Sequence, residues 1–182
     1  MHEKRDKELH AFWWNRERER LLARWTRGAV HHSICVMRKP NGRVFVDSYF
    51  EIANGPMIID GPPLVLHSMD DAGRLGEAVL EGLAKSFRRI LPPRNLRTDP
   101  PHPDYPQERK AKTWSEYRRH ATMVHVDADY EERIDAVMLT PYHNMGRSTS
   151  QPITDAKFTI TFESPEQLGR AVQDAMARAT TV

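Results

Sequence analysis

The feature that most constrains this chain of 182 residues is an internal repeat. Residues 168–172 (LGRAV) resemble residues 75–79 (LGEAV), and each segment follows a short apolar run that ends near a serine. Glycine inside a helix costs about 1 kcal/mol relative to alanine, so its recurrence at matching places needs a structural reason. We expect each segment to be a helix packed tightly on a sheet.

Helix starts are predicted at both copies. Ser164 and Ser68 each stand before a possible first turn, where a serine side chain can accept a hydrogen bond from the backbone N–H three residues later. Gln167 and Asp71 occupy that third position, from which a side chain can accept a hydrogen bond from the backbone N–H of the serine. The first helix is therefore predicted over about residues 69–90.

The repeat extends beyond the helices. Trp25 matches Trp114, and residues 34–36 match residues 123–125, both at a shift of 89 residues, whereas the Leu-Gly pairs match at a shift of 93. Repeats of this length are too long for a solenoid, whose units run to about 20–50 residues. They indicate a duplicated half-domain with a loop insertion between its strands and its helix.

Short apolar runs before each helix predict three strands per copy. In residues 43–52 the apolar side chains alternate with polar ones, a pattern typical of an antiparallel strand with one solvated face. The predicted fold is α+β: two β-β-β-α repeats forming an antiparallel sheet with helices packed on it. Whether the strands form one sheet or two stays open. The other expected strands cover residues 33–37, 64–67, 121–126, 134–140 and 156–162, with a loop at 141–147.

The domain organisation follows from composition. Residues 1–27 are predicted to be an N-terminal amphipathic helix, and residues 28–182 a single domain made of half-repeats 28–91 and 113–182. A proline-rich linker, 92–112, joins the halves. The alternative for the N-terminal helix, a basic membrane-surface helix, is disfavoured by its interspersed acidic residues.

Composition also limits the class of protein. No apolar run approaches the roughly 18 residues that span a bilayer, the N-terminus is charged, and the single Cys35 cannot form an internal disulfide. We expect a cytoplasmic protein that does not insert into a membrane and binds no cofactor. The two half-repeats are acidic, whereas residues 88–119 are basic. Nucleic-acid binding through residues 88–119 is the alternative function, although no known binding motif or stacking platform accompanies this charge.

A metal-dependent enzyme is the third hypothesis. His125, Asp127 and Asp129 alternate along one predicted strand, so their side chains could share a face and bind a divalent metal. A solvated sheet face has the same pattern, and the first copy offers no second ligand set at 36–38. With no phosphate loop, cysteine knuckle or nucleophile motif in the sequence, we expect neither a metal nor enzymatic activity.

The second half-repeat resembles the CdiI immunity proteins of bacterial contact-dependent growth inhibition systems. The resemblance lies in a Trp114 lead-in, two strands ending in Pro141-x-x-Asn144-x-Gly146, a third strand and the helix opening at Ser164, and it covers roughly residues 25–180. It implies a cytoplasmic, non-enzymatic protein that binds the C-terminal toxin domain of a CdiA effector, often a nuclease, and blocks its active site.

Candidate partner-binding residues come from the acidic repeats. A nuclease presents a basic surface, which an inhibitor can cover with carboxylates and aromatic anchors. The densest acidic run lies around the second strand turn, and further candidates lie on the outward face of the strand at 43–52. A solvated polar face explains each residue individually as well. The candidates are Asp47, Tyr49, Glu51, Asp127, Asp129, Glu131, Glu132 and Asp135.

Overall fold

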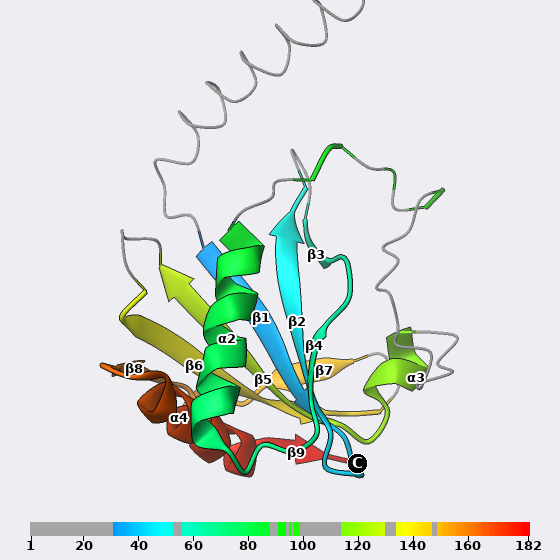
Figure 1. Ribbon diagram of the computed structural model, residues 1–182. Coiled ribbons are helices and arrows are strands. Elements are labelled where there is room, and N and C mark those ends of the chain that lie inside the picture. Colours follow the sequence, from blue (N-terminus) through cyan, green and yellow to red (C-terminus); the bar gives the residue numbers. More distant parts are fainter. Residues whose placement is uncertain are drawn as a thin grey trace, which may run out of the picture. The chain divides into compact units, whose positions relative to one another are not determined.

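A computed structural model describes residues 31–52, 56–87, 91–93, 95, 97–98, 114–129, 134–146 and 149–182. The predicted N-terminal helix, most of the linker, and Glu131 and Glu132 lie outside these residues. The elements are β1 (His31–Arg38), β2 (Val44–Glu51), β3 (Met57–Ile59), β4 (Leu64–Leu66), α2 (Ala72–Phe87), α3 (Trp114–Arg118), β5 (Thr122–Asp129), β6 (Ala136–Asn144), β7 (Ser150–Pro152), the 3₁₀ turn η2 (Thr154–Ala156), β8 (Phe158–Thr161), α4 (Pro165–Arg178) and β9 (Thr180–Thr181) (Figure 1).

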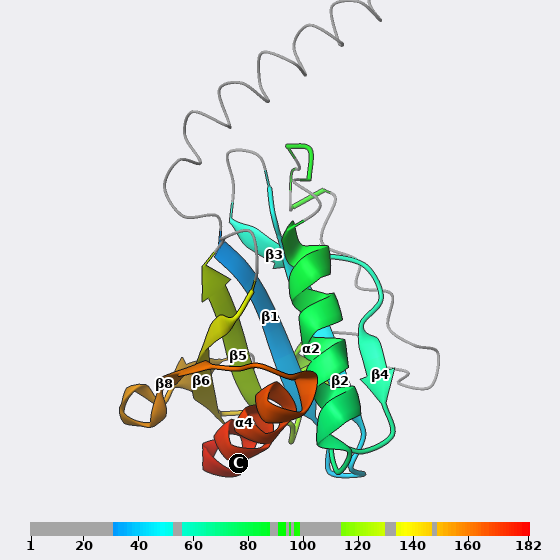
Figure 2. The ribbon, with the colours of Figure 1, turned by 60° about the vertical axis from the view of Figure 1, so that its left-hand side comes forward.

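The described strands form one nine-stranded, mostly antiparallel sheet. Its order is β3-β2-β1-β5-β6-β7, with β4 also paired to β2, and with β8 and β9 also paired to β6. The two halves meet where β1 lies antiparallel to β5, with Val36 opposite Val124. Helices α2 and α4 cover the same face of this curled sheet (Figures 1 and 2). The predicted α+β class is confirmed.

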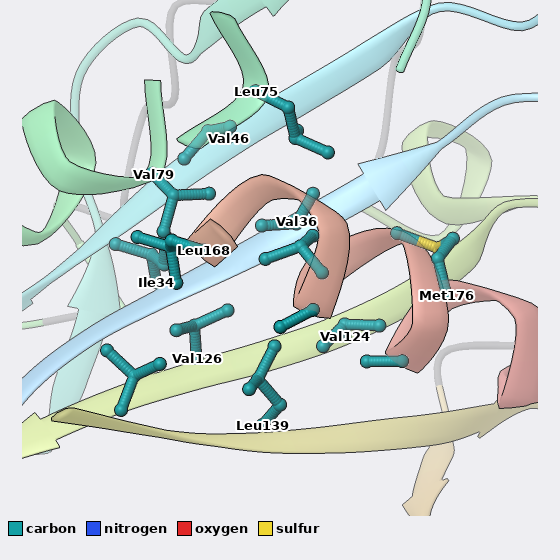
Figure 3. Packing of buried hydrophobic residues seen from close by; sticks show 14 of the residues in the cluster. Ile34, Val36, Val46, Leu75, Val79, Val124, Val126, Leu139, Leu168 and Met176 are labelled. Atoms are coloured by element: carbon teal, nitrogen blue, oxygen red, sulfur yellow. The ribbon is translucent and has the colours of Figure 1, made fainter. Parts of the chain in front are cut away.

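The core lies between the sheet and these two helices. Alternate residues of the central strands, such as Ile34 and Val36 on β1 and Val124 and Val126 on β5, are fully buried beneath Leu75 and Leu168 (Figure 3). Each such aliphatic side chain contributes about 1.5–3 kcal/mol on burial. The periodic stripes of both helices therefore share one core with strands from both halves.

The shift of 93 residues relates equivalent positions in the two helices, whereas the shift of 89 residues does not relate equivalent positions in the first strands. A shift of 89 equates Ile34, which faces the helices, with Met123, which faces the opposite side. Because side chains alternate along a strand, any odd shift exchanges the two faces. The match of residues 34–36 with 123–125 is therefore wrong as an alignment, although the strands themselves are equivalent in order.

The repeated glycines mark a crossing of helix on helix. A Cβ built on Gly76 would lie 1.7 Å from the carbonyl oxygen of Pro165, and a Cβ built on Gly169 would lie 1.8 Å from the carbonyl oxygen of Ala72. The two contacts are reciprocal at the shift of 93. The expectation of close packing is correct, but its partner is the first turn of the other helix and not the sheet.

The helix starts agree with the sequence in one copy and differ in the other. Ser164 accepts a hydrogen bond from Gln167 N at 3.3 Å, as predicted. In the first copy α2 begins at Ala72, and Asp71 is the capping residue, because its Oδ1 accepts from Arg74 N at 3.0 Å. Ser68 instead accepts from Asp70 N at 3.2 Å, within the preceding turn. The predicted start near residue 69 is therefore three residues early.

Strand β6 continues through the predicted loop. Residues 141–144 belong to the strand, with Pro141 opposite Val124 on β5 and its carbonyl accepting a hydrogen bond from Ile153 N at 2.9 Å. A proline lacks only the donor, so it is tolerated where its carbonyl still pairs. This extension places Tyr142 on the sheet, opposite Met123 on β5.

Candidate functional site

The face of the sheet opposite α2 and α4, here called the second face, carries the polar and aromatic candidates. Strand alternation directs to it the odd-numbered residues of β1, β2 and β5 and the even-numbered residues of β6. Register aligns these residues in rows across the strands. The rows are Phe45, Met37, Met123 and Tyr142; then Asp47, Cys35, His125 and Thr140; then Ser33, Asp127 and Met138, with Tyr49 next to Ser33.

Part of the second face is buried beneath α3. Tyr117 on this short helix is 1% exposed and packs against Phe45 and Met123. Its hydroxyl donates to the carboxylate of Asp47, at 3.1 Å from Oδ1 and 2.8 Å from Oδ2. Asp47 is itself 1% exposed. The expectation of a solvated strand face is wrong at Asp47, which lies in a small second core.

Two polar side chains donate hydrogen bonds to backbone carbonyls in and just after α3. The Asn144 Nδ2 donates to the carbonyls of Arg118 at 2.8 Å and Ala121 at 2.7 Å. Lys39 donates to the carbonyl of Tyr117 and lies over the ring of the same residue. These bonds satisfy carbonyl groups at the end of α3, which would otherwise lack partners. They hold α3 in place on the second face.

A strip of three rings crosses the part of the second face that α3 leaves accessible. Tyr49, His125 and Tyr142 are all partly exposed. The His125 ring stacks on Tyr142 with centroids 4.3 Å apart, and its Nε2 lies 3.4 Å from the hydroxyl oxygen of Tyr49. We call these residues the aromatic strip. They come from β2, β5 and β6, so only the folded sheet assembles them.

The aromatic strip is uncharged near neutral pH. Burial, with a smaller contribution from Arg118, lowers the pKa of His125 from 6.5 to about 4. Burial raises the pKa of Tyr49 well above its ordinary value, and burial followed by the charge of Asp127 raises the pKa of Tyr142. The strip therefore offers neutral rings and hydroxyl groups to a partner.

A carboxylate is fixed at the edge of the aromatic strip. Asp127 Oδ1 accepts a hydrogen bond of 2.6 Å from the hydroxyl of Ser33 on the neighbouring strand. The side chain of Asp127 is partly exposed. Asp129 follows two residues later on the same strand, opposite His31, although its side chain lies outside the described part of the chain.

The remaining acidic candidates gather at one end of the sheet. Glu51 ends β2, Asp129 ends β5 and Asp135 precedes β6, and the antiparallel register brings these three positions to the same end. Glu51 and Asp135 are exposed. Three spacings of about 4.8 Å separate β2 from β6, so these charges span about 14 Å. Sequence distance alone could not show this grouping.

The catalytic alternatives receive no support from the described residues. Within residues 31–182 as far as they are described, no group of three His, Cys, Asp or Glu side chains could hold a metal ion. Asp127 bonds to Ser33, whereas His125 contacts the two tyrosines. Burial raises the pKa of the Cys35 thiol, which favours its unreactive protonated form.

Of the basic residues in 88–119, the structure describes Arg97, Arg118 and Arg119. Arg118 is directed inward, with Nε 3.3 Å from the sulfur of Met123 and a further hydrogen bond to Ser150. Arg97 and Arg119 are exposed. The other basic residues of 88–119 lie outside the described ranges, so this alternative stays a prediction.

Comparison with known proteins relates the fold to two solved structures. No protein-family model and no curated protein matches the sequence. A protein of unknown function from Neisseria meningitidis matches with a TM-score of 0.56 and 15% identity, over 82% of this chain and 96% of that chain. A chain of the CdiA-CT/CdiI toxin and immunity complex from Yersinia pseudotuberculosis matches with a TM-score of 0.55 and 14% identity, over 84% and 99%. This chain therefore has the fold of a protein found in a toxin–immunity complex.

Among the helices that the structure describes, none is both long enough and apolar enough to cross a membrane.

Proposed function

We propose that this chain is an immunity protein that binds and neutralises the C-terminal toxin domain of a contact-dependent growth inhibition effector. The observation that carries the proposal is the shared fold with a chain of a toxin–immunity complex, which extends over 84% of this chain and 99% of that chain. The resemblance noted in the second half-repeat agrees with this proposal. Binding without chemistry agrees with a site made of neutral rings and carboxylates.

The partner-binding surface of this proposal is the acidic end of the sheet, next to the aromatic strip residue Tyr49. The carboxylates of Glu51 and Asp135 are exposed at this end, where β2 finishes and β6 begins. Opposite charge across an interface speeds association and selects the partner, and a nuclease toxin needs a basic surface to hold nucleic acid. Asp47 supports this surface from within by anchoring α3. The proposed contacts are Tyr49, Glu51, Asp127, Asp129, Glu131, Glu132 and Asp135.

Protection of cells tests the function directly. Where a large secreted effector is encoded beside this gene, its C-terminal domain is taken as the toxin and is expressed with and without the chain. We expect growth to be restored only when the chain is present. Unchanged killing despite soluble, folded protein would contradict the proposal for that toxin.

Stoichiometry separates blocking from enzymatic inactivation. An inhibitor that covers an active site removes toxin activity in proportion to its amount and reaches full inhibition near one chain per toxin. An enzyme that modifies the toxin would inactivate it at far lower ratios. Titration of purified chain against toxin activity distinguishes these outcomes.

Charge reversal locates the surface. Replacing both Glu51 and Asp135 by lysine should slow association and remove much of its dependence on salt, because these carboxylates are exposed and at the acidic end. Glu77→Lys/Asp174→Lys is the matched control, since these two residues are exposed on α2 and α4, which cover the other face of the sheet. Equal effects of the two double variants would place the toxin elsewhere.

A further inference from the structure

Two rings of the aromatic strip, Tyr49 and His125, lie in the part of the sheet whose strands contain carboxylates and no Lys or Arg, and Tyr142 lies one row further along, opposite Met123. The segments of the four central strands at this end are residues 31–35, 47–51, 125–129 and 136–140. They contain four acidic residues and no Lys or Arg, as the sequence shows: HHSIC, DSYFE, HVDAD and AVMLT. The opposite end has Arg38 as the last residue of β1, and Lys39 and Arg43 in the β1–β2 turn. The sheet is thus polarised in charge along its strands.

We propose that the aromatic strip and Asp127 together form a receptor for one Lys or Arg side chain of the protein partner. The inference rests on the proposed function only in taking the toxin domain as that partner. The inference goes beyond the proposed function by naming the chemical group that is bound and the four residues that bind this group. The aromatic rings supply a surface for the cation, and the carboxylate supplies its counter-charge.

The receptor is already formed in the free chain. His125 is held between two tyrosines, with its ring 4.3 Å from Tyr142 and 5.4 Å from Tyr49 between centroids. Ser33 orients the carboxylate of Asp127 through a bond of 2.6 Å. Little side-chain freedom remains to be lost on binding, and preorganisation of this kind raises affinity. A cation gains more from an aromatic face when a docked protein removes the surrounding water.

Arg118 shows where the receptor ends. The charge of this residue affects the pKa values of all three rings, His125, Tyr49 and Tyr142, but its guanidinium is directed to Met123 and Ser150 beside α3. Asp127 lies two rows from Met123, toward the acidic end. A cation bound at Asp127 is therefore separated from Arg118 by the His125 row, and meets carboxylates on the other side.

Stacking of nucleobases is the other use of aromatic rings on a sheet face. Single-stranded nucleic acids bind by base stacking on such rings together with basic side chains that neutralise phosphates. Here the flanking side chains are Asp127 and Glu51, which repel phosphates. The charge therefore favours a cationic protein group over nucleic acid.

A small-molecule probe tests the receptor without any toxin. N-acetyl-argininamide is titrated into the full chain, and the His125 ring resonances, identified by comparison with His125→Gln, are followed by NMR. We expect saturable shifts with a dissociation constant on the order of millimolar, the range of a single weak contact. N-acetyl-citrullinamide, which is neutral and similar in shape, should bind at least tenfold more weakly. Equal responses to the two probes would overturn the proposal.

Variants of the receptor test it in the same titration. Asp127→Asn keeps an acceptor for Ser33 but removes the charge, and Tyr142→Leu removes a ring. Each should weaken argininamide binding at least fivefold, whereas Tyr142→Phe should leave it within twofold, because the ring remains. Asp174→Asn on α4 is the matched control for loss of a carboxylate. Unchanged binding by both Asp127→Asn and Tyr142→Leu, in folded protein, would refute the assignment.

Two further measurements separate this inference from the proposed function. A single-stranded oligonucleotide that competes with argininamide at 0.15 M salt would show that the strip is a stacking platform, which overturns the proposal. In the toxin complex, Asp127→Asn and Tyr142→Leu should each raise the dissociation constant at least tenfold. If the chain neutralises toxin but neither variant weakens binding, the function stands and the receptor fails. If argininamide binds as expected but no toxin is neutralised, the receptor stands and the function fails.

Discussion

Substituting the crossing glycines with alanine tests the way in which the two halves are joined. A Cβ at residue 76 would lie 1.7 Å from Pro165 O and 2.5 Å from Pro165 C, both backbone atoms of α4. Non-bonded heavy atoms need about 3.5–4.0 Å, so the helices must separate by more than about 1 Å. Backbone cannot rotate away as the end of a side chain can. The same holds at Gly169 against Ala72.

The expected magnitude follows from two opposing contributions. Overpacking costs about 1–3 kcal/mol, and a backbone clash belongs at the upper end of that range. Alanine recovers about 1 kcal/mol of helix propensity. We therefore expect Gly76→Ala and Gly169→Ala each to lower the free energy of unfolding by about 2 kcal/mol. With a urea m-value of about 2 kcal/mol/M, the midpoint should fall by about 1 M.

The control lies in the same helix. A Cβ at Gly73 meets only the side-chain oxygen Asp71 Oδ1, at an ordinary 3.4 Å. Gly73→Ala should therefore stabilise the protein by about 0.5–1 kcal/mol through helix propensity alone. Urea unfolding followed by circular dichroism measures all three variants. The sign of the change thus separates a close helix contact from an open one.

The double variant tests the reciprocity of the contacts. Once one alanine has pushed the helices apart, the second meets less resistance. The loss in Gly76→Ala/Gly169→Ala should therefore be smaller than the sum of the single losses by about 0.5–3 kcal/mol, the range for coupled neighbours. Stabilisation by both single alanines would show that the helices do not cross at these glycines, and the reasoning would be wrong.

Three other changes address the second face and the helix starts. Tyr117→Phe should cost about 1–3 kcal/mol, because it leaves the buried carboxylate of Asp47 without the hydroxyl that donates to it; urea unfolding measures this, and a neutral result would mean that the bond adds nothing. Burial lowers the pKa of His125 from 6.5 in the unfolded chain to about 4 in the folded chain. The neutral His125 side chain therefore contributes fully to the free energy of unfolding above pH 6.5, and this contribution is lost as the pH falls toward 4. Between pH 8 and pH 5 the loss should be about 2 kcal/mol, and His125→Gln should flatten that part of the stability–pH curve; a parallel curve would contradict the shift. Ser164→Ala and Asp71→Ala should each cost about 1 kcal/mol, because each removes a helix cap; no change at Asp71 would restore Ser68 as the capping residue.

The sequence was sufficient for features that depend on local periodicity. The apolar stripe of α2, through Leu75, Val79 and Leu83, is buried as helical spacing predicts, and the cap at Ser164 is where its side chain can reach the free backbone N–H groups. The alternation in β2 identifies which residues share a face. These signals act over a few residues, and the chain carries them whatever the tertiary arrangement.

Tertiary structure decided what covers each face and which residues meet. Asp47 and Tyr49 have the same alternation pattern, yet α3 buries Asp47 through Tyr117, 70 residues later in the chain, and leaves Tyr49 partly exposed. Tyr142 had no strand signal, because a proline precedes it and only pairing with β5 continues the strand. Glycine recurrence indicated close packing, but the identity of the opposing backbone depended on the crossing of two helices 93 residues apart. Contacts between distant segments depend on the whole fold, and local periodicity carries no information about them.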